Sequence, residues 1–374
     1  MILPGATLGV LGGGQLGRFF VLRAHDLGYR VTVMDPDPAS PAGLIADRHI
    51  AAPFTDEAAL RALGTSCQAI TTEFENVPAA ALALLASLTR VSPSAVAVAV
   101  AQDRLLEKTH LADAGFGTAA FLPVRSREEA AEAAERLGRP GILKTSRLGY
   151  DGKGQAPVNA PSECQAAFES LGSVECILEE RLHLETELSV ILARGADGEV
   201  AVYPPAENVH RNGILHSTVV PARVGASVAR EAGELAAGVA ASLEYVGVLG
   251  VELFVANGGQ LYVNEIAPRP HNSGHYTLDA AVTDQFEQQL RAMCGLPLGS
   301  TELLSPVAMV NLLGDLWTSG EPQWDRALGL HGVRLHLYGK AEPRASRKMG
   351  HLACLAESAD SALTKALEAY NALT

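Results

Sequence analysis

The sequence predicts a mixed α/β and α+β protein with two or three domains. Its first 35 residues contain a strand, a glycine-rich turn, a helix and a second strand, which is the βαβ unit of an open parallel sheet. Later parts of the chain consist largely of short apolar runs joined by turns, which indicates antiparallel sheets. A chain of 374 residues is longer than the usual length of a domain with a single hydrophobic core. Its apolar content of 48% is enough to fill several cores.

The N-terminal unit is predicted from Ala6 onward. Residues 6–11 form an apolar strand, the turn Gly12–Gly17 follows, and a helix runs to about Leu27 before a second strand that ends at Asp35. This pattern matches the dinucleotide fingerprint of glycines and a distant acid. The same glycines would serve any phosphate at a helix N-terminus, so an NAD-dependent dehydrogenase is only one alternative.

Two further strands of the same sheet are expected over residues 45–50 and 69–76. Glu73 and Asn76 fall where the second of these ends. Ligands of open α/β sheets bind at the carboxyl ends of strands, which makes both residues candidates for a binding site. For Glu75 we expect simple solvation instead.

A domain boundary is expected near residue 100. Residues 92–101 are small and predict a linker, and a helix begins in Gln102–Lys108 and ends at Gly115–Gly117. Residues 126–137, rich in alanine and glutamate, predict another helix with one solvated face.

A glycine-rich loop follows the next predicted strand. The strand Gly141–Thr145 carries Lys144, and the loop Gly149–Gln155 contains three glycines and Lys153. Backbone N–H groups of such a loop can close over phosphates, while the lysines supply positive charge. The loop lacks the Ser or Thr of a P-loop. The alternative is a flexible hairpin turn.

The following section is predicted to be rich in strands. Residues 176–182 form an apolar run that ends in acids, which suits recognition of an adenine amino group and ribose hydroxyls. Strands over 186–191 and 201–203 come next, and residues 207–211 are expected to be a polar loop. A single histidine such as His210 is more often structural than functional.

A hairpin carries the strongest chemical signal. The apolar run Val248–Val255 contains Glu252, the turn Asn257–Gly259 follows, and the next strand leads to Asn264 and Glu265. Pairing within this hairpin would bring two carboxylates and a carboxamide together, a set of oxygen ligands suited to Mg²⁺. The alternative is that Glu252 faces solvent on an edge strand.

Two groups of basic and polar residues are candidate anion sites. Arg269, His271 and Asn272 lie in a proline-rich loop directly after the hairpin. The cluster of Lys340, Arg344, Arg347 and Lys348 stands out because the chain has a net charge of −13. An exposed basic patch is the alternative for this cluster.

Several classes of partner are disfavoured. No run rich in lysine and arginine is present, so nucleic acid is not expected as a partner. No uninterrupted apolar stretch of transmembrane length and no signal peptide are evident. The five cysteines are scattered without metal-binding spacing, as expected of reduced thiols in the cytoplasm.

In their order along the chain, these features resemble the ATP-grasp superfamily. Within it, the chain is similar to the 5-(carboxyamino)imidazole ribonucleotide synthase family of purine biosynthesis. The matching segments span nearly the whole chain; they are Gly12–Arg18, Glu73–Pro78, Gly149–Gln155, Asn264–His275 and Arg347–His351. The glycine loop combined with the Asn264–His275 segment is the most specific part of the match.

The resemblance implies a ligase with three domains. These are a Rossmann-like (pre-ATP-grasp) domain over 1–100 that binds no dinucleotide, an ATP-grasp domain over 101–295 and a small β-rich domain over 296–374. It also implies that ATP, Mg²⁺ and bicarbonate are used to carboxylate aminoimidazole ribonucleotide through carboxyphosphate, and that the protein forms a homodimer. A different ATP-grasp ligase, such as a formate-dependent glycinamide ribonucleotide transformylase, is the nearest alternative. A non-catalytic nucleotide-binding module is another.

The resemblance also assigns residues. ATP would contact Arg104, Lys144, Gly149, Tyr150, Asp151, Gly152, Lys153, Gly154, Gln155, Glu179, Glu180, Arg181, Leu182, Glu187, His210, Asn264 and Glu265. The metal would bind Glu252 and Glu265. The ribonucleotide would contact Gln15, Glu73, Asn76, Tyr150, Asp151, Lys340 and Arg347, and bicarbonate would contact Arg269, His271 and Asn272. Asp151 is expected to orient the reacting amine or accept its proton, and Arg269, His271, Lys340 and Arg347 complete the expected catalytic set.

Two positions depart from the family pattern. Leu148 stands where a second glycine is common before the loop, which puts the mobility of the loop in question. Arg181 stands where an apolar residue usually lies beside the adenine, and a guanidinium stacked on the base is one possible replacement.

Overall fold

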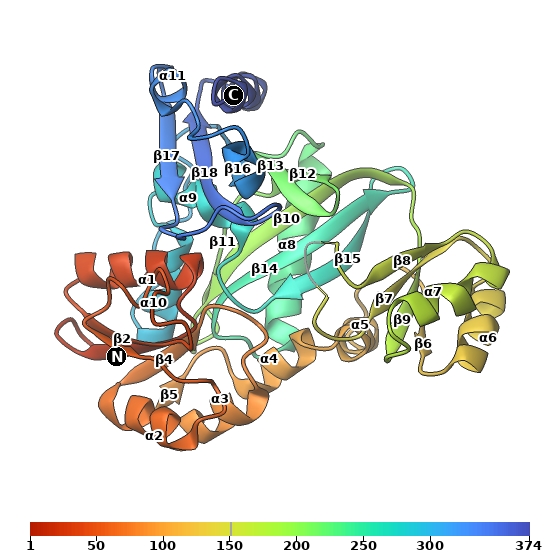
Figure 1. Cartoon of the computed structure of the whole chain (residues 1–374), viewed down its shortest axis with the longest axis horizontal. Coiled ribbons are helices and arrows are strands. Elements are labelled where there is room, and N and C mark those ends of the chain that lie inside the picture. The colour runs from red at the N-terminus through yellow and green to blue at the C-terminus, as the bar shows by residue number, and fades with distance from the viewer. Residues whose placement is uncertain (150–151) are drawn as a thin grey trace.

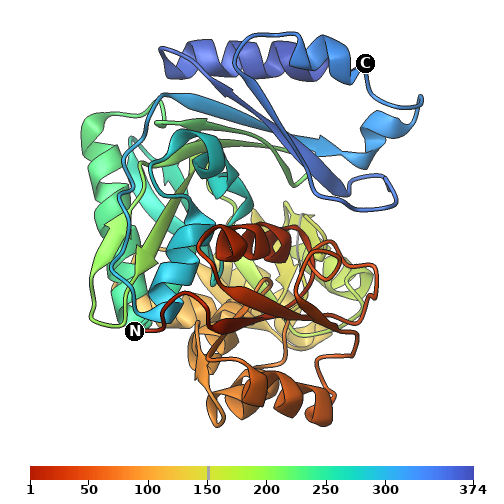
Figure 2. The ribbon, with the colours of Figure 1, turned by 90° about the vertical axis from the view of Figure 1, so that its left-hand side faces the viewer.

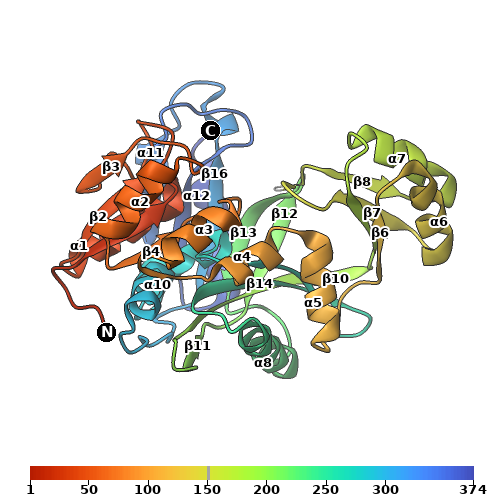
Figure 3. The same cartoon turned by 90° about the horizontal axis from the view of Figure 1, so that it is seen from below.

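The computed structural model describes residues 1–149 and 152–374, which form three units around one cleft (Figure 1). The N-terminal unit and the C-terminal strands lie on one side of the molecule. A smaller antiparallel lobe projects on the other side, and the view from below separates this lobe clearly from the rest (Figure 3).

The N-terminal unit is a parallel sheet in the order β3-β2-β1-β4-β5. Its strands are β1 (Thr7–Leu11), β2 (Arg30–Met34), β3 (Arg48–Ile50), β4 (Ala69–Thr72) and β5 (Arg90–Val91), and its helices are α1 (Gln15–Asp26), α2 (Glu57–Ser66), α3 (Ala79–Ala86) and α4 (Ala95–Ala101). The predicted βαβ unit and the two further strands are confirmed.

The predicted linker over residues 92–101 was wrong, because it contains helix α4. Ser94 caps this helix by accepting a hydrogen bond from the N–H group of Ala97. Alternating alanine and valine give no polar face, so the segment resembles a linker in sequence. In the fold, Ala97 and Val98 are buried against neighbouring elements.

The projecting lobe is a four-stranded antiparallel sheet in the order β6-β9-β7-β8. Its elements are β6 (Phe121–Val124), α6 (Arg127–Leu137), β7 (Gly141–Thr145), β8 (Gln155–Val158), a 3-10 turn (Pro161–Glu163), α7 (Cys164–Ser170) and β9 (Cys176–Glu180). Helix α5 (Arg104–Asp113) precedes the lobe and contacts both β9 and the hairpin strand β15. The strand with Lys144 and the helix from residue 127 are as predicted.

A nine-stranded sheet forms the centre of the molecule, with the path β15-β14-β10-β12-β13-β16-β18-β17 and with β11 paired to β10. Its strands are β10 (Leu184–Arg194), β11 (Val200–Val202), β12 (Ala206–Arg211), β13 (Ile214–Val220), β14 (Gly247–Ala256), β15 (Gln260–Ala267), β16 (Val307–Leu313), β17 (Val333–Leu337) and β18 (Lys348–Leu355). Strands β16 to β18 therefore extend the central sheet through the β13–β16 pair.

The polar loop expected over residues 207–211 was also wrong. These residues belong to β12, which pairs with β10 and β13. The segment lacks the alternation of apolar and polar residues that is typical of a strand. It is polar because Asn208 and His210 line a polar cleft.

Helices cover the sheet and join the units. They are α8 (Ala226–Ser242), α9 (Thr277–Ala280), α10 (Gln285–Cys294), α11 (Trp324–Leu328) and α12 (Ala359–Asn371), with 3-10 turns at Asn272–Tyr276 and Gly314–Trp317. Helix α10 packs against α1 and so ties the N-terminal unit to the central sheet. Helix α12 lies across β16 and β18 (Figure 2).

All five cysteines are buried and free of disulfides. The longest helix of the described chain, α8, has 17 residues, and none of the described helices combines the length and hydrophobicity of a membrane span.

Candidate active site

A cleft of about 1350 Å³ lies where the three units meet. Its lining combines Gln15 and Glu73 of the N-terminal unit, Lys144 of the lobe, Glu252 of the central sheet and Arg347 near the C-terminus. Pockets for one small molecule usually measure about 300–1,000 Å³. This cleft therefore has room for more than one substrate.

Most residues that the sequence singled out line this cleft. They are Gln15, Glu73, Asn76, Arg104, Lys144, Gly149, Gly152, Lys153, Gln155, Glu179, Glu180, Arg181, Leu182, Glu187, His210, Glu252, Asn264, Glu265, Arg269, His271, Asn272, Lys340 and Arg347. Gly154 is placed differently: its carbonyl oxygen accepts a hydrogen bond from the N–H group of Thr145 beside the cleft. Tyr150 and Asp151 lie outside the described residues.

Two carboxylates face each other across the predicted hairpin. Glu252 of β14 is the direct partner of Glu265 of β15. A bulge follows this pair, since the next partners are Leu253 and Val263, so that Asn264 is an extra residue in β15. A bulge sets two residues opposite one and re-aims their side chains. Asn264 and Glu265 consequently both line the cleft beside Glu252.

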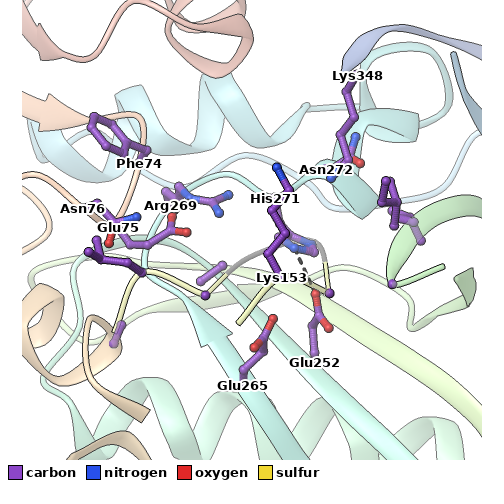
Figure 4. Close-up of a pocket in the computed structure, with 18 of the residues that line it drawn as sticks. Phe74, Glu75, Asn76, Lys153, Glu252, Glu265, Arg269, His271, Asn272 and Lys348 are labelled. Carbon is purple, nitrogen blue, oxygen red and sulfur yellow. Dashed lines mark hydrogen bonds and ion pairs between the residues drawn. The ribbon is translucent and has the colours of Figure 1, made fainter. Parts of the chain in front are cut away.

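Each carboxylate has a basic side chain as its partner. Arg104 donates to Glu265 over 2.7 Å, and the Nε2 atom of His271 lies 3.1 Å from Glu252. The view of the cleft shows the two acids side by side below His271 (Figure 4). Burial opposes ionisation of Glu252, but the hydrogen bond and charge of His271 hold its pKa at about 2. Burial likewise opposes ionisation of Glu265, and Arg104 lowers its pKa.

These acids and Asn264 fit a hard divalent cation. The Oδ1 atom of Asn264 is buried and has no hydrogen-bond partner within the part of the chain that the structure describes. Together with the two ionised carboxylates that line the same cleft, this oxygen completes an all-oxygen ligand set of the kind that Mg²⁺ prefers.

A second group of possible metal ligands lies outside the cleft. Oxygen and nitrogen atoms of Asp279, His336 and His351 come within 4.8 Å of one another. Asp279 forms a hydrogen bond of 2.8 Å with Nε2 of His336, and Nδ1 of His351 forms one of 3.0 Å with the Tyr338 hydroxyl. The rings of His336 and His351 stack, and Phe19 of α1 packs against both. We therefore assign this group to packing between the units.

The part of the cleft between the lobe and the central sheet holds two ion pairs. The Lys144 ammonium lies 3.0 Å from Glu179, and His210 lies 2.5 Å from Glu187. Burial opposes ionisation of Glu179, but the nearby lysines lower its pKa. Arg181, the departure from the family pattern, donates to the Asn159 side chain over 3.0 Å and is thus held at the edge of the cleft.

The glycine loop has backbone angles that explain its composition. Gly152 has a φ angle of 76°, and a Cβ atom there would lie 3.0 Å from the Cα atom of Gly213. Leu148, the other departure, has a φ angle of 62°. This left-handed conformation suits glycine and strains a leucine.

The N-terminal glycine turn already binds an anion from the chain itself. The carboxylate of Glu73 accepts hydrogen bonds from the N–H groups of Gly14 at 2.5 Å and Gly17 at 2.9 Å. Asp35 accepts one from Gly13 at 2.7 Å. Burial raises the pKa of Glu73, and the two N–H groups oppose that shift. The donors that a dinucleotide pyrophosphate would need are thus already occupied.

The expectation that Glu75 is solvated was wrong. Glu75 forms an ion pair with Arg269, and both side chains are largely buried in the cleft (Figure 4). Burial opposes ionisation of Glu75, but the Arg269 charge lowers its pKa. The two residues are 194 positions apart, so no local pattern could reveal the pair.

The C-terminal basic residues converge on the same cleft. Lys340 donates to the carbonyl oxygen of Lys348 over 2.8 Å, and Arg347 donates to that of Glu342 over 2.9 Å. All of the four bases that the sequence grouped together line the cleft. Asn272 is buried and exchanges hydrogen bonds with Asn311 at 3.1 and 2.7 Å.

Three family models match successive parts of the chain. Residues 5–102 match the ribonucleotide synthetase preATP-grasp domain, residues 109–286 match the ATP-grasp domain, and residues 307–365 match the phosphoribosylaminoimidazole carboxylase C-terminal domain. Residues Arg104 to Lys108 of α5 fall between the first two matches.

Curated relatives and solved structures agree with these matches. The N5-carboxyaminoimidazole ribonucleotide synthase of Bacillus subtilis is 43% identical over 96% of this chain and 94% of its own length, and that of Brucella melitensis is 44% identical over 93% and 96%. The crystal structure of an ADP complex of N5-carboxyaminoimidazole ribonucleotide synthetase has a TM-score of 0.94 at 42% identity and covers 99% of this chain and 97% of its own. The Aspergillus clavatus synthase in complex with ADP and 5-aminoimidazole ribonucleotide has a TM-score of 0.91 at 33% identity, with 98% of each chain covered.

Proposed function

The chain belongs to the N5-carboxyaminoimidazole ribonucleotide synthase family of ATP-grasp ligases, and from this we propose how its cleft performs the reaction. The enzyme uses ATP and bicarbonate to carboxylate the exocyclic amine of 5-aminoimidazole ribonucleotide, and it releases ADP and phosphate in purine biosynthesis. One observation carries the proposal: a single cleft joins the Glu252–Glu265 acid pair to the bases Lys340 and Arg347.

ATP occupies the half of the cleft between the lobe and the central sheet. Lys144 and Lys153 offer positive charge to the phosphates, and the glycine loop offers backbone N–H groups. Glu179 to Leu182 and Glu187 lie where the adenine and ribose are read, and His210 supports Glu187 through its ion pair. Arg104 is within reach of the phosphates beside Glu265.

Glu252, Glu265 and Asn264 hold Mg²⁺ in this proposal. When bound there, the ion would supply positive charge for the phosphoryl group being transferred. The chain contributes the fixed acid pair and the bulge that brings Asn264 to the same side.

Bicarbonate is bound next to the acids by Arg269 and His271, with Asn272 behind them. The Glu75 ion pair fixes the Arg269 guanidinium, and the Ser273 hydroxyl bonds to Nδ1 of His271 at 2.8 Å. Transfer of the γ-phosphoryl group to a bicarbonate oxygen gives carboxyphosphate and ADP. Positive charge in this position stabilises that intermediate and the leaving phosphate.

The ribonucleotide lies between the N-terminal unit and the C-terminal bases. Lys340 and Arg347 bind its phosphate, and Gln15, Glu73 and Asn76 bind the ribose and base. Its amine attacks the carbon of carboxyphosphate or of the CO₂ released from it, phosphate leaves, and Asp151 orients the amine or accepts its proton. Closure of the glycine loop excludes water, which would hydrolyse carboxyphosphate.

We extend the proposal to organisation and location. The units 1–100, 101–295 and 296–374 act as substrate, nucleotide and phosphate-binding parts, and the protein works as a cytoplasmic homodimer. Its partners are the three small molecules of the reaction, without nucleic acid or membrane.

The reaction is tested by isotope transfer. With bicarbonate labelled in oxygen, one labelled oxygen should appear in the phosphate released, but only when ATP and the ribonucleotide turn over. Unlabelled phosphate with normal turnover would contradict the carboxyphosphate route, because phosphate would then have formed by attack of water.

A further inference from the structure

Helix α5 buries charged side chains where a helix normally buries apolar ones. Arg104, Glu107, Lys108 and Leu111 have the spacing of a single helix face, the stripe that usually faces a core. Glu107 is 2% exposed and Lys108 is 1% exposed. Buried charged groups destabilise a fold unless they are bonded to partners, so the partners of these two residues indicate their role.

Their partners are backbone groups of the hairpin strand that carries the metal ligands. Nζ of Lys108 donates to the carbonyl oxygen of Val263 over 3.1 Å, and Oε1 of Glu107 accepts from the N–H group of Ile266 over 2.6 Å. Strand β15 is the edge of the nine-stranded sheet, so its outward-facing backbone groups have no neighbouring strand. Side chains of helix α5 supply partners for two of them, and the carbonyl oxygen of Gly117 accepts a hydrogen bond from the N–H group of Val263.

The spacing of these two contacts depends on the bulge. In a regular strand, backbone groups that point to the same side recur every two residues. Val263 and Ile266 are three residues apart, and both point outward because one extra residue, Asn264, lies between the paired positions. The two backbone contacts of Glu107 and Lys108 therefore depend together on the bulge.

The bulged register matters for the site. Without it, strict alternation would turn Asn264 and Glu265 to opposite faces of β15. Lys108 also lies 3.5 Å from Glu179, the residue that Lys144 contacts at 3.0 Å. The same buried lysine thus links the bulge to the strand that ends at the nucleotide.

We propose that Glu107 and Lys108 are positioning residues that hold the β15 bulge in the register in which Asn264 and Glu265 both face the metal. They act through the backbone of Val263 and Ile266. The inference rests on the proposed function, which assigns the metal to this acid pair.

The test compares variants of the full chain by Mn²⁺ binding in the presence of ADP, followed by electron paramagnetic resonance. Partners behind metal ligands typically contribute about 10- to 100-fold in metal affinity, and we expect a weakening of that size in Lys108→Met and Glu107→Ala. Glu107→Gln keeps an oxygen that can accept from Ile266, and it should bind Mn²⁺ within about threefold of the unmodified chain. Thr109→Ala, an exposed change on the same helix, is the control.

The outcomes separate a positioning role from a merely structural one. Weaker Mn²⁺ binding in Glu107→Ala, with recovery in Glu107→Gln, supports a positioning role for these residues. If Lys108→Met does not fold, the two Glu107 variants alone test that role. Lower melting temperatures with unchanged Mn²⁺ affinity would overturn it. If the unmodified chain binds no Mn²⁺ with ADP, the metal assignment fails. The positioning role of Glu107 and Lys108, which rests on that assignment, then fails as well.

Discussion

Glu252 and Glu265 are direct cross-strand partners on β14 and β15, and each is held by a different base. Two ionised carboxylates at such a distance repel each other unless a cation lies near both. Arg104 lies against Glu265 and His271 lies against Glu252, so each acid has its own basic partner. The pair is thus prepared for a divalent cation, and several measurable consequences follow from its surroundings.

Removal of one acid should abolish turnover. In Glu265→Ala, the rate of ADP formation should fall at least about 100-fold, because metal charge contributes several kcal/mol to phosphoryl transfer. Circular dichroism should be unchanged. Glu199→Ala, an exposed acid in the same part of the chain, should keep full activity. Full activity of Glu265→Ala would remove this residue from the metal site.

Arg347→Ala should affect one substrate only. Loss of a charge-assisted hydrogen bond of about 1.5–3 kcal/mol should raise the KM of the ribonucleotide about 10- to 100-fold. The KM of ATP should stay nearly constant, because the proposal assigns Arg347 to the phosphate of the ribonucleotide and not to ATP. Arg334→Ala, an exposed arginine on β17, should change neither value. Equal effects on both substrates would contradict the assignment of Arg347.

Gly14→Ala should displace Glu73 from the glycine turn. A Cβ atom at this position would lie 2.5 Å from Oε1 of Glu73, well inside van der Waals contact. We expect a rise in the ribonucleotide KM of about tenfold or more, the effect of losing roughly 1.4 kcal/mol of binding. Gly233→Ala, where the nearest atom lies at 3.7 Å, should leave that KM unchanged. An unaltered KM in Gly14→Ala would exclude Glu73 from substrate binding.

The Glu75–Arg269 pair should make stability depend on pH in a defined direction. The folded-state pKa of Glu75 lies below its ordinary value of 4.5, so the pair stabilises the fold above that value and loses its effect as the pH falls through the folded-state pKa. Glu75→Gln, which removes the charge, should cost about 1–3 kcal/mol at neutral pH. The difference in melting temperature between the two chains should then shrink as the medium is acidified below pH 4.5. A difference independent of pH would contradict the ion pair.

The sequence predicted the hairpin because Asn257, Gly258 and Gly259 punctuate two apolar runs, and it correctly predicted that Glu252 meets Glu265. The bulge was beyond reach, because period-two alternation puts Asn264 and Glu265 on opposite faces. The register of the folded hairpin shows the bulge, and with it the reason why both side chains reach the cleft.

Three other features of the fold could not be predicted from local sequence patterns. Helix α4 lacks the amphipathic pattern of a helix because all its residues are small and apolar. Strand β12 lacks the alternating pattern of a strand because its polar residues line a cleft. Glu75 and Arg269 are 194 positions apart in the sequence. Their ion pair forms because the N-terminal unit packs against the central sheet. Local patterns thus predicted elements and strand ends, whereas contacts between units required the fold.

ADP release from Mg-ATP and bicarbonate, measured with and without 5-aminoimidazole ribonucleotide, tests the central claim most directly. We predict that ADP forms at a substantial rate only when the ribonucleotide is present, and that Glu265→Ala shows no such stimulation. If ATP binds but the ribonucleotide causes no stimulation, the assignment of the acceptor is wrong, even though the fold and nucleotide site stand.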